Sequence, residues 1–189
     1  VLTKKKVKAH PQIMIPQISS IDELNHIKKI YDSIKKETET KHKMKLKINF
    51  GTMIEVVRAA LTANELATTA EFFSFGTNDL TQGTFSFSRE DVEGKFLPEY
   101  MEKELLETNP FQSIDESGVG SLIKIGITAG RKIRKNIEVG ICGEHGGDPK
   151  SIKFCHGEGL SYVSASPHRI PIAIVAAAQA AIEQPKKKK

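Results

Sequence analysis

A short, strongly apolar run that ends in a glycine constrains the fold of this chain more than any other feature. Three phenylalanines occur within residues 72–75, a run too short for a helix and suited to a buried β-strand. Gly76 ends the run, and Thr77, Asn78 and Asp79 follow it without a gap. In α/β enzymes, a buried strand that ends in polar residues places chemistry at the carboxyl edge of a sheet. From spacing alone, a strand followed by an ordinary Asn-Asp turn fits equally well.

The polar cluster and a preceding acid have the residue types that a ligand and a hard cation require. Gly76 lets the backbone approach a ligand, and Thr77 and Asn78 can orient one. Glu55 ends the previous predicted strand, about one βα unit before Asp79, so both carboxylates would face the same opening. Such a pair suits Mg²⁺, which usually takes one or two carboxylates and leaves its other positions to water and substrate. Taken alone, Glu55 also fits a surface acid at a strand end.

The rest of the chain alternates between short apolar segments and helical patterns, which predicts an α/β fold with a parallel sheet. The five predicted strands are residues 12–18, 45–55, 72–76, 138–143 and 160–164. The predicted helices are residues 21–36, a short helix from residue 62 to the Phe-rich strand, 119–135, a helix from 149 that ends at Gly157 or Gly159, and 171–182, the last packed on the sheet. Capping boxes are predicted at Ser20–Glu23 and Thr62–Glu65, and an N-cap at Asp148.

The long connection at residues 81–118 is rich in Phe and acidic residues. A connection of this length over a strand end is usually a lid or a binding excursion. We therefore expect it to lie near the site.

Cys142 lies in the glycine-rich stretch GICGEHGG, where the low backbone lets a thiol reach a substrate. Three interpretations are open from the residues alone: a buried structural cysteine, a catalytic thiol, and a zinc site. The zinc site would use Cys142, His145, Cys155 and His156, although this spacing fits no standard zinc finger.

Composition excludes several classes of function. The 189 residues are 39% hydrophobic and 27% charged, without a membrane-spanning run or a secretory signal. Two cysteines and no signal predict a reducing compartment, the cytoplasm or an organelle. Much of the net charge of +5 lies in residues 4–8 and 186–189. The interior lacks aromatic residues interleaved with basic ones, so these ends are predicted to be solvated rather than to bind nucleic acid or a membrane. The predicted divisions are 1–9, a basic segment; 10–183, the folded unit; and 184–189, a disordered lysine tail.

Three stretches carry a resemblance to a known family. The string EFFSFGTNDLTQ at residues 71–82 closely resembles the phosphoenolpyruvate (PEP)-utilising enzymes, which include PEP synthase and enzyme I of the sugar phosphotransferase system. GTMIE at 51–55 and GICGEHGGDP at 140–149 narrow the resemblance to the pyruvate phosphate dikinases. The resemblance extends in order from about residue 11 to 182 and includes the segment SYVSASPHRIPIA.

The resemblance implies a fold and a site. The family fold is a (β/α)₈ TIM barrel, of which this chain would supply the C-terminal portion of about five βα units. By the resemblance, Glu55 and Asp79 bind Mg²⁺ and substrate, and Gly76, Thr77 and Asn78 contact substrate. Cys142 matches the family's proton donor, with Glu144 and His145 as neighbours that could tune its pKa. Arg58 follows Glu55 on a helix surface, and Val57 stands where relatives have proline.

The resemblance also implies what lies elsewhere. In this family ATP, phosphate and pyruvate interconvert with AMP, pyrophosphate and PEP through a phosphohistidine on a separate domain. None of the six histidines lies in that context, and no Gly-rich ATP loop is present. The expected partners are therefore PEP or pyruvate, the N-terminal nucleotide-binding and phosphohistidine domains, and a second copy in a homodimer. We expect this chain alone to be inactive. The alternative is a non-catalytic fragment or binding module with basic tails.

Overall fold

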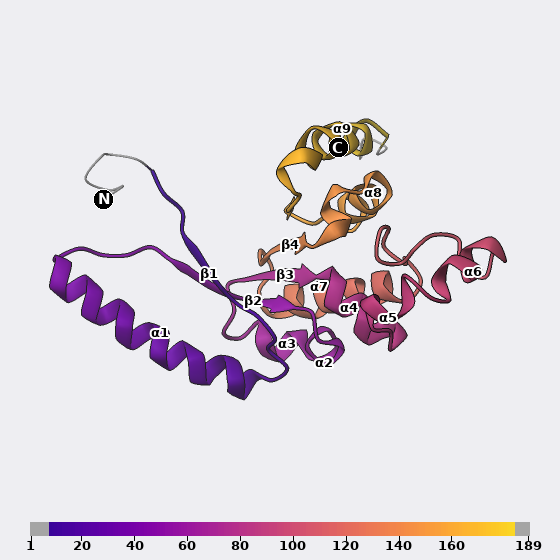
Figure 1. Ribbon diagram of the computed structural model, residues 1–189. Coiled ribbons are helices and arrows are strands. Elements are labelled where there is room, and N and C mark those ends of the chain that lie inside the picture. Colours follow the sequence, from indigo (N-terminus) through magenta and orange to yellow (C-terminus); the bar gives the residue numbers. More distant parts are fainter. Residues whose placement is uncertain (1–7, 184–189) are drawn as a thin grey trace.

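A parallel five-stranded sheet organises the computed structural model, which describes residues 8–183 (Figure 1). The strands are β1 (Gln12–Ile15), β2 (Asn49–Ile54), β3 (Phe72–Gly76), β4 (Glu138–Cys142) and β5 (Tyr162–Val163). Each strand pairs in parallel with the next one along the chain, which gives the order β1-β2-β3-β4-β5. Sequential parallel strands joined by helical crossovers are the arrangement of successive units in a (β/α)₈ barrel. The predicted α/β class and partial barrel are confirmed.

Helices fill every connection between the strands. They are α1 (Ile21–His42), α2 (Val57–Leu61), α3 (Ala63–Leu66), α4 (Thr77–Phe85), α5 (Arg89–Val92), α6 (Leu97–Glu102), α7 (Val119–Ile133), α8 (Pro149–Gly157) and α9 (Ile170–Glu183). Two short 3₁₀ helices, η2 (Glu144–Gly147) and η3 (Pro167–Arg169), flank α8 and β5. No helix in residues 8–183 combines the length and the apolar character needed to cross a lipid bilayer.

The outward face of β3 packs against α7, and glycines on that helix allow the close approach. A Cβ atom on Gly126 would lie 2.9 Å from the ring of Phe75, and one on Gly130 would lie 2.6 Å from the ring of Phe73. Both phenylalanines are fully buried. The alternation of side chains along a strand then turns Ser74 and Gly76 to the opposite, inward face.

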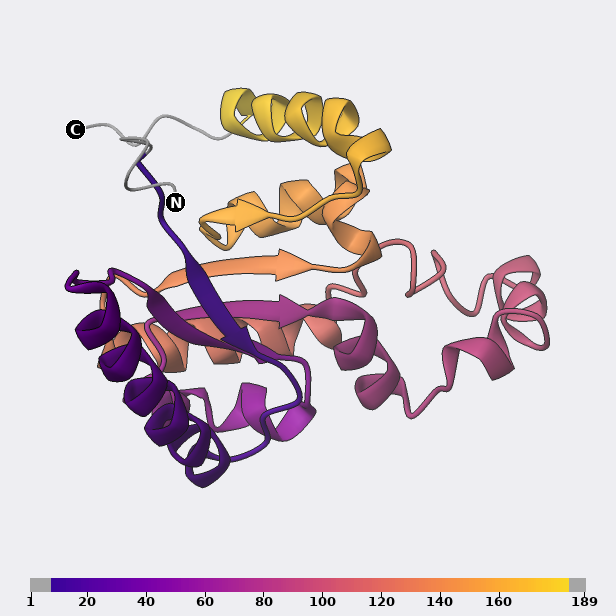
Figure 2. The ribbon, with the colours of Figure 1, turned by 60° about the vertical axis from the view of Figure 1, so that its left-hand side comes forward.

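The long connection extends beyond the carboxyl edge of the sheet, on the side to which the arrows of β3 and β4 point (Figure 2). We call residues 86–118 the excursion. It has a small hydrophobic cluster of its own, made by Val92, Leu97 and Phe111 with Phe87, Phe96 and Leu106 packed against them. Its predicted role as a lid stays a prediction.

The hydrogen bonds at the helix ends test the three caps that were predicted from the sequence. The capping box at Ser20 and Glu23 is confirmed, as is the Asp148 N-cap, which accepts from the Ser151 amide at 2.8 Å. The capping box predicted at Thr62 is wrong, because its hydroxyl donates instead to the Arg58 carbonyl in the preceding turn.

The first helix is longer than predicted. α1 continues to His42 instead of stopping near Lys36, and its C-cap residue, Lys43, has the left-handed conformation. The charged residues 37–42 break the apolar pattern, but lysine and glutamate are good helix formers and do not break the helix.

Two apolar elements are less covered than predicted. β1 was expected to be a buried strand, but it is an edge strand and Ile13 is 39% exposed. α9 was expected to pack on the sheet, but it packs on α8 through small residues that include Ala173 and Ala176. Its opposite side is exposed at Ile170, Ile172, Ile174, Val175 and Ile182. The predicted strands 12–18, 45–55 and 160–164 are also shorter than expected. The lysine-rich ends, residues 1–7 and 184–189, lie outside the described residues.

The Ser20 cap gives a test of this fold. Glu23 accepts from the Ser20 amide at 3.0 Å and the Ser20 hydroxyl accepts from the Glu23 amide at 3.3 Å. Ser20→Ala should lower the free energy of unfolding by about 1 kcal/mol, measured by urea titration of the chain. Ser33→Ala on the exposed face of α1 is the matched control and should change it by less than about 0.5 kcal/mol. Equal effects of the two variants would contradict the cap.

Candidate active site at the carboxyl edge of the sheet

The predicted site residues follow the ends of three neighbouring strands. Glu55 follows β2, the segment 77–79 opens α4 directly after β3, and Cys142 ends β4. The parallel register pairs Gly76 with Cys142 and Ile54 with Phe75. All of these residues therefore lie at one edge of the sheet.

Glu55 and Asp79 form a close pair of acids in unequal surroundings. Glu55 is only 5% exposed, and its Oε1 accepts a hydrogen bond from the Gln17 amide at 2.6 Å. Asp79 is exposed and accepts from Gln82 Nε2 at 3.0 Å. Burial raises the pKa of Glu55, the Gln17 amide opposes this rise, and the neighbouring Asp79 carboxyl, within hydrogen-bonding reach, adds to it. The pair therefore favours a shared proton or a cation.

Gly76 is required at this edge for a steric reason. A Cβ atom there would lie 2.7 Å from Glu55 Oε2 and 2.8 Å from Met53 Sδ. The absence of a side chain leaves room for the Glu55 carboxylate on the inward face. Its predicted contact with substrate stays a prediction.

Cys142 is half-buried beside the acid pair. Its Sγ lies 3.7 Å from the Phe75 carbonyl oxygen and 4.0 Å from Met53 Sδ. Burial raises the pKa of the Cys142 thiol, a hydrogen bond from Ser74 lowers it, and the charges of Glu55 and Asp79 raise it further. The thiol, not the thiolate, is therefore the favoured form near neutral pH.

Two inward residues near this thiol were missed by sequence reasoning. Ser74, Gly140 and Tyr162 are partners in register across β3, β4 and β5. The Tyr162 ring covers Gly140, where a Cβ atom would lie 2.3 Å from the ring. Ser74 also hydrogen-bonds Tyr162, whose pKa is raised by burial. The sequence did contain a signal for Ser74. Side chains alternate along the Phe-rich strand, so Ser74 faces inward between two outward phenylalanines.

Thr77 and Asn78 hold the turn that follows β4. Thr77 is fully buried, with its Oγ1 2.9 Å from the Cys142 carbonyl oxygen. Asn78 Oδ1 accepts from the Glu144 amide at 3.3 Å. Gly143 has a positive φ of 112°, which favours glycine. The two side chains thus join the acid-bearing helix α4 to the cysteine-bearing strand, and their contacts with substrate stay predictions.

The other residues considered from the sequence do not join the acid pair and the thiol. No group of three or more His, Cys, Asp or Glu side chains that could hold a metal gathers within residues 8–183, so the zinc alternative is wrong. Cys155 is buried, and burial raises its pKa to about 12. His145, expected as a tuner of the thiol, has ring contacts with Thr77 and Pro110. Arg58 donates to the Ser19 carbonyl.

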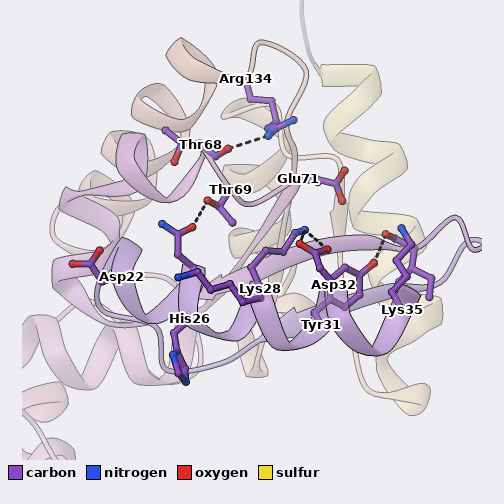
Figure 3. A pocket seen from close by; sticks show the side chains of 13 residues that line it. Asp22, His26, Lys28, Tyr31, Asp32, Lys35, Thr68, Thr69, Glu71 and Arg134 are labelled. Atoms are coloured by element: carbon purple, nitrogen blue, oxygen red, sulfur yellow. Dashed lines mark hydrogen bonds and ion pairs between the residues drawn. The ribbon is translucent and has the colours of Figure 1, made fainter. Parts of the chain in front are cut away.

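A cavity of about 850 Å³ lies at the opposite end of the strands (Figure 3). Its lining includes Ile48 and Glu71, which precede β2 and β3, and Arg134, which follows α7. Two of the cationic groups there are engaged: Lys28 pairs with Asp32 at 2.5 Å, and Arg134 donates to the backbone of residues 67 and 68. Because βα enzymes act at the carboxyl edge, the acid and thiol cluster is the stronger candidate.

The parallel βα units in sequential order, with polar side chains gathered at the carboxyl edge, place this chain in the class of (β/α)-barrel enzyme domains. The chain belongs to the PEP-utilising enzyme family, because the family profile described as "PEP-utilising enzyme, PEP-binding domain" matches residues 1–182. The resemblance drawn from the three sequence stretches is thereby confirmed.

Several relatives of this chain are pyruvate, phosphate dikinases. The Entamoeba histolytica enzyme is 53% identical over 97% of this chain and 21% of its own length. The Clostridium symbiosum enzyme is 50% identical over 91% of this chain and 20% of its own length. The chain thus spans about a fifth of the length of these relatives. A citrate lyase from Burkholderia xenovorans shares the fold, with a TM-score of 0.56 and 14% identity over 90% of this chain and 49% of that one.

The electrostatics of the thiol can be tested by alkylation. In Glu55→Gln, loss of one negative charge should lower the Cys142 pKa and speed its reaction with iodoacetamide at pH 8, because the thiolate is the reactive form. Glu144, which was expected to tune the thiol, is exposed and is not among the groups that shift the Cys142 pKa. Glu144→Gln is therefore the matched control and should leave the rate unchanged. Mass spectrometry of peptides separates Cys142 from the buried Cys155. A slower reaction in Glu55→Gln would contradict the arrangement.

Proposed function

We propose that this chain forms part of the pyruvate and PEP site of a pyruvate, phosphate dikinase. The observation that carries the proposal is the meeting of Glu55, Asp79 and Cys142 at one edge of the sheet. The dikinases related to this chain, 50% and 53% identical over nearly all of it, support the same assignment. The whole enzyme would interconvert ATP, phosphate and pyruvate with AMP, pyrophosphate and PEP.

The step assigned to this site is the pyruvate half of that reaction. PEP gives its phosphoryl group to a histidine on another domain, which breaks the bond between phosphorus and the enol oxygen and leaves the enolate of pyruvate. A proton added to carbon 3 then gives pyruvate. In reverse, a base removes that proton and the enolate oxygen attacks the phosphohistidine. The site must therefore stabilise oxyanion charge and supply one proton.

Glu55 and Asp79 fit a Mg²⁺ ion. Two carboxyl groups within hydrogen-bonding reach, one of them buried, repel each other as anions. Mg²⁺ usually takes one or two carboxylates and leaves its other positions to water and substrate oxygens. When bound there, the ion would supply positive charge to the enolate and phosphoryl oxygens. Gly76, Thr77 and Asn78 are proposed to contact substrate beside it.

Cys142 is proposed as the proton donor to carbon 3. Its burial and the two nearby acids keep the thiol protonated, which is the form a donor needs. The Ser74 hydroxyl hydrogen-bonds the sulfur and favours the thiolate that remains after transfer. That thiolate is the base of the reverse direction.

We propose that the chain works as part of a longer polypeptide. Five strands leave an open sheet where a barrel has eight, and β1 is exposed at its edge. The same proposal places nucleotide-binding and phosphohistidine domains elsewhere in that polypeptide. It also includes a homodimeric assembly and a cytoplasmic or organellar location. The alternative of a binding module depends on basic ends outside residues 8–183.

The proposal is tested with an assembled enzyme, in which this chain replaces the matching part of the Entamoeba histolytica relative. Mg²⁺-dependent exchange of the pyruvate methyl protons with deuterated solvent, followed by NMR, reports the carbon 3 proton transfer. Cys142→Ala should slow the exchange by about 100-fold or more, because a positioned acid or base contributes this much. Glu55→Gln should slow it and raise the Mg²⁺ concentration required.

The matched control is Cys155→Ala, which changes the other thiol and should leave the exchange rate within about twofold. The 189-residue chain alone should show no exchange. Undiminished exchange in Cys142→Ala, or no exchange in an assembled enzyme that is folded, would overturn the proposed function.

A further inference from the structure

His145 is a fully buried imidazole with a polar contact at each ring nitrogen. Nδ1 lies 2.7 Å from Thr77 Oγ1, and Nε2 lies 2.9 Å from the Pro110 carbonyl oxygen. One neighbour belongs to the candidate site, and the other belongs to the excursion. Neither contact is needed to explain how the acid pair or the thiol works.

The protons in this network can be counted. A carbonyl oxygen only accepts, so Nε2 must carry the proton that faces Pro110. Burial lowers the pKa of His145, which favours a neutral ring with one proton. Nδ1 is then an acceptor, and the Thr77 hydroxyl must donate to it.

The Thr77 hydroxyl has a single proton and two acceptors within reach. Its oxygen is 2.7 Å from His145 Nδ1 and 2.9 Å from the Cys142 carbonyl oxygen. The imidazole therefore decides where the hydroxyl points. Thr77 is the first residue of α4, two positions before Asp79, so the hydroxyl lies at the start of the acid-bearing helix.

The Pro110 contact joins the same imidazole to the excursion. Other bonds also fasten the end of the excursion to the same part of the fold. Among them, Ser113 Oγ donates to Asp148 at 3.0 Å, and the Ile114 amide donates to Ser151 Oγ at 2.9 Å. These three anchors lie on η2 and at the start of α8. Of the three, His145 alone also touches a residue of the candidate site.

We infer that His145 is a positioning residue that couples the anchoring of the excursion at Pro110 to the orientation of Thr77 beside the Cys142 turn. Its effect on turnover rests on the proposed function, whereas its effects on the excursion and on the ring tautomer do not. A displacement of the excursion at Pro110 would then change the orientation of Thr77 through this ring.

Two variants separate the two contacts. An asparagine amide reaches about as far as Nδ1, so His145→Asn keeps a partner for Thr77 and loses Pro110. A glutamine amide reaches about as far as Nε2, so His145→Gln keeps Pro110 and loses Thr77. In the assembled enzyme, His145→Gln should lower kcat for proton exchange on the order of tenfold with KM little changed, and His145→Asn should keep most of kcat.

Trypsin cleavage after Lys95 or Lys103 reports the anchoring of the excursion in the 189-residue chain. His145→Asn should be cut severalfold faster than the wild type, and His145→Gln at nearly the wild-type rate. The inference would be overturned if both variants had the same decrease in kcat and the same increase in cleavage rate. A residue that only fills space would give this result, because its two variants would not differ.

The imidazole of the unmodified chain gives a measurement that needs no variant. Its ¹⁵N shifts at pH 7 should show the neutral ring with the proton on Nε2. A proton on Nδ1, or a charged ring, would overturn the inference and would decide the matter if the variants fail to fold. If the assembled enzyme shows no exchange while cleavage and tautomer behave as expected, the proposed function fails and the coupling stands.

Discussion

The parallel register of the three central strands is the constraint on which the site depends. Because β2, β3 and β4 run in the same direction, residues that follow each strand meet at one edge although they are far apart in the chain. β3 has the central place. Phe73 and Phe75 face outward and hold α7 against the sheet, while Ser74 and Gly76 face inward. The same five residues therefore make core packing on one face and line the candidate site on the other. A shift of β3 by one residue would exchange these faces, so the buried phenylalanines fix the register of the site as well as the fold.

Much of this arrangement was predictable from local patterns. The Phe-rich run predicted a buried strand, and the polar residues after it predicted a site at the carboxyl edge. The Ser20 and Asp148 caps were also readable, because the groups involved lie within three residues of each other. The cap predicted at Thr62 was wrong because its hydroxyl had a competing acceptor in the preceding turn, the Arg58 carbonyl. An apolar pattern also fails to tell which partner covers an element. β1 and α9 have the composition of buried elements, yet within residues 8–183 much of their apolar surface stays exposed.

Contacts between distant segments could not be predicted. The His145 ring touches residues 68 and 35 positions away, and no periodicity in the sequence connects them. The neighbours of histidine in the chain suggested a role near the thiol, but the short 3₁₀ helix turns its ring toward Thr77 and Pro110. Ser74 was overlooked for a related reason. Its significance arises because Gly140 leaves space for the Tyr162 ring to cross the next strand, which is a property of the pairing register and not of any one segment.

The acid pair influences the site in two ways that cannot be separated. The charges of Glu55 and Asp79 raise the pKa of Cys142, and the same two carboxylates form the cation site of the proposed function. Positive charge placed between them would weaken their effect on the thiol, so cation binding and thiol ionisation are linked, each favouring the other. In the proposed reaction this link favours the thiolate that remains after the proton has been given, and the thiolate needed for the reverse direction. Without positive charge, the acids add to the effect of burial, which is the largest cause of the raised Cys142 pKa, and favour the protonated sulfur. In the proposed reaction the charge on the neighbouring acids would therefore adjust the protonation state that burial sets, and a donor that must also act as a base requires such an adjustment.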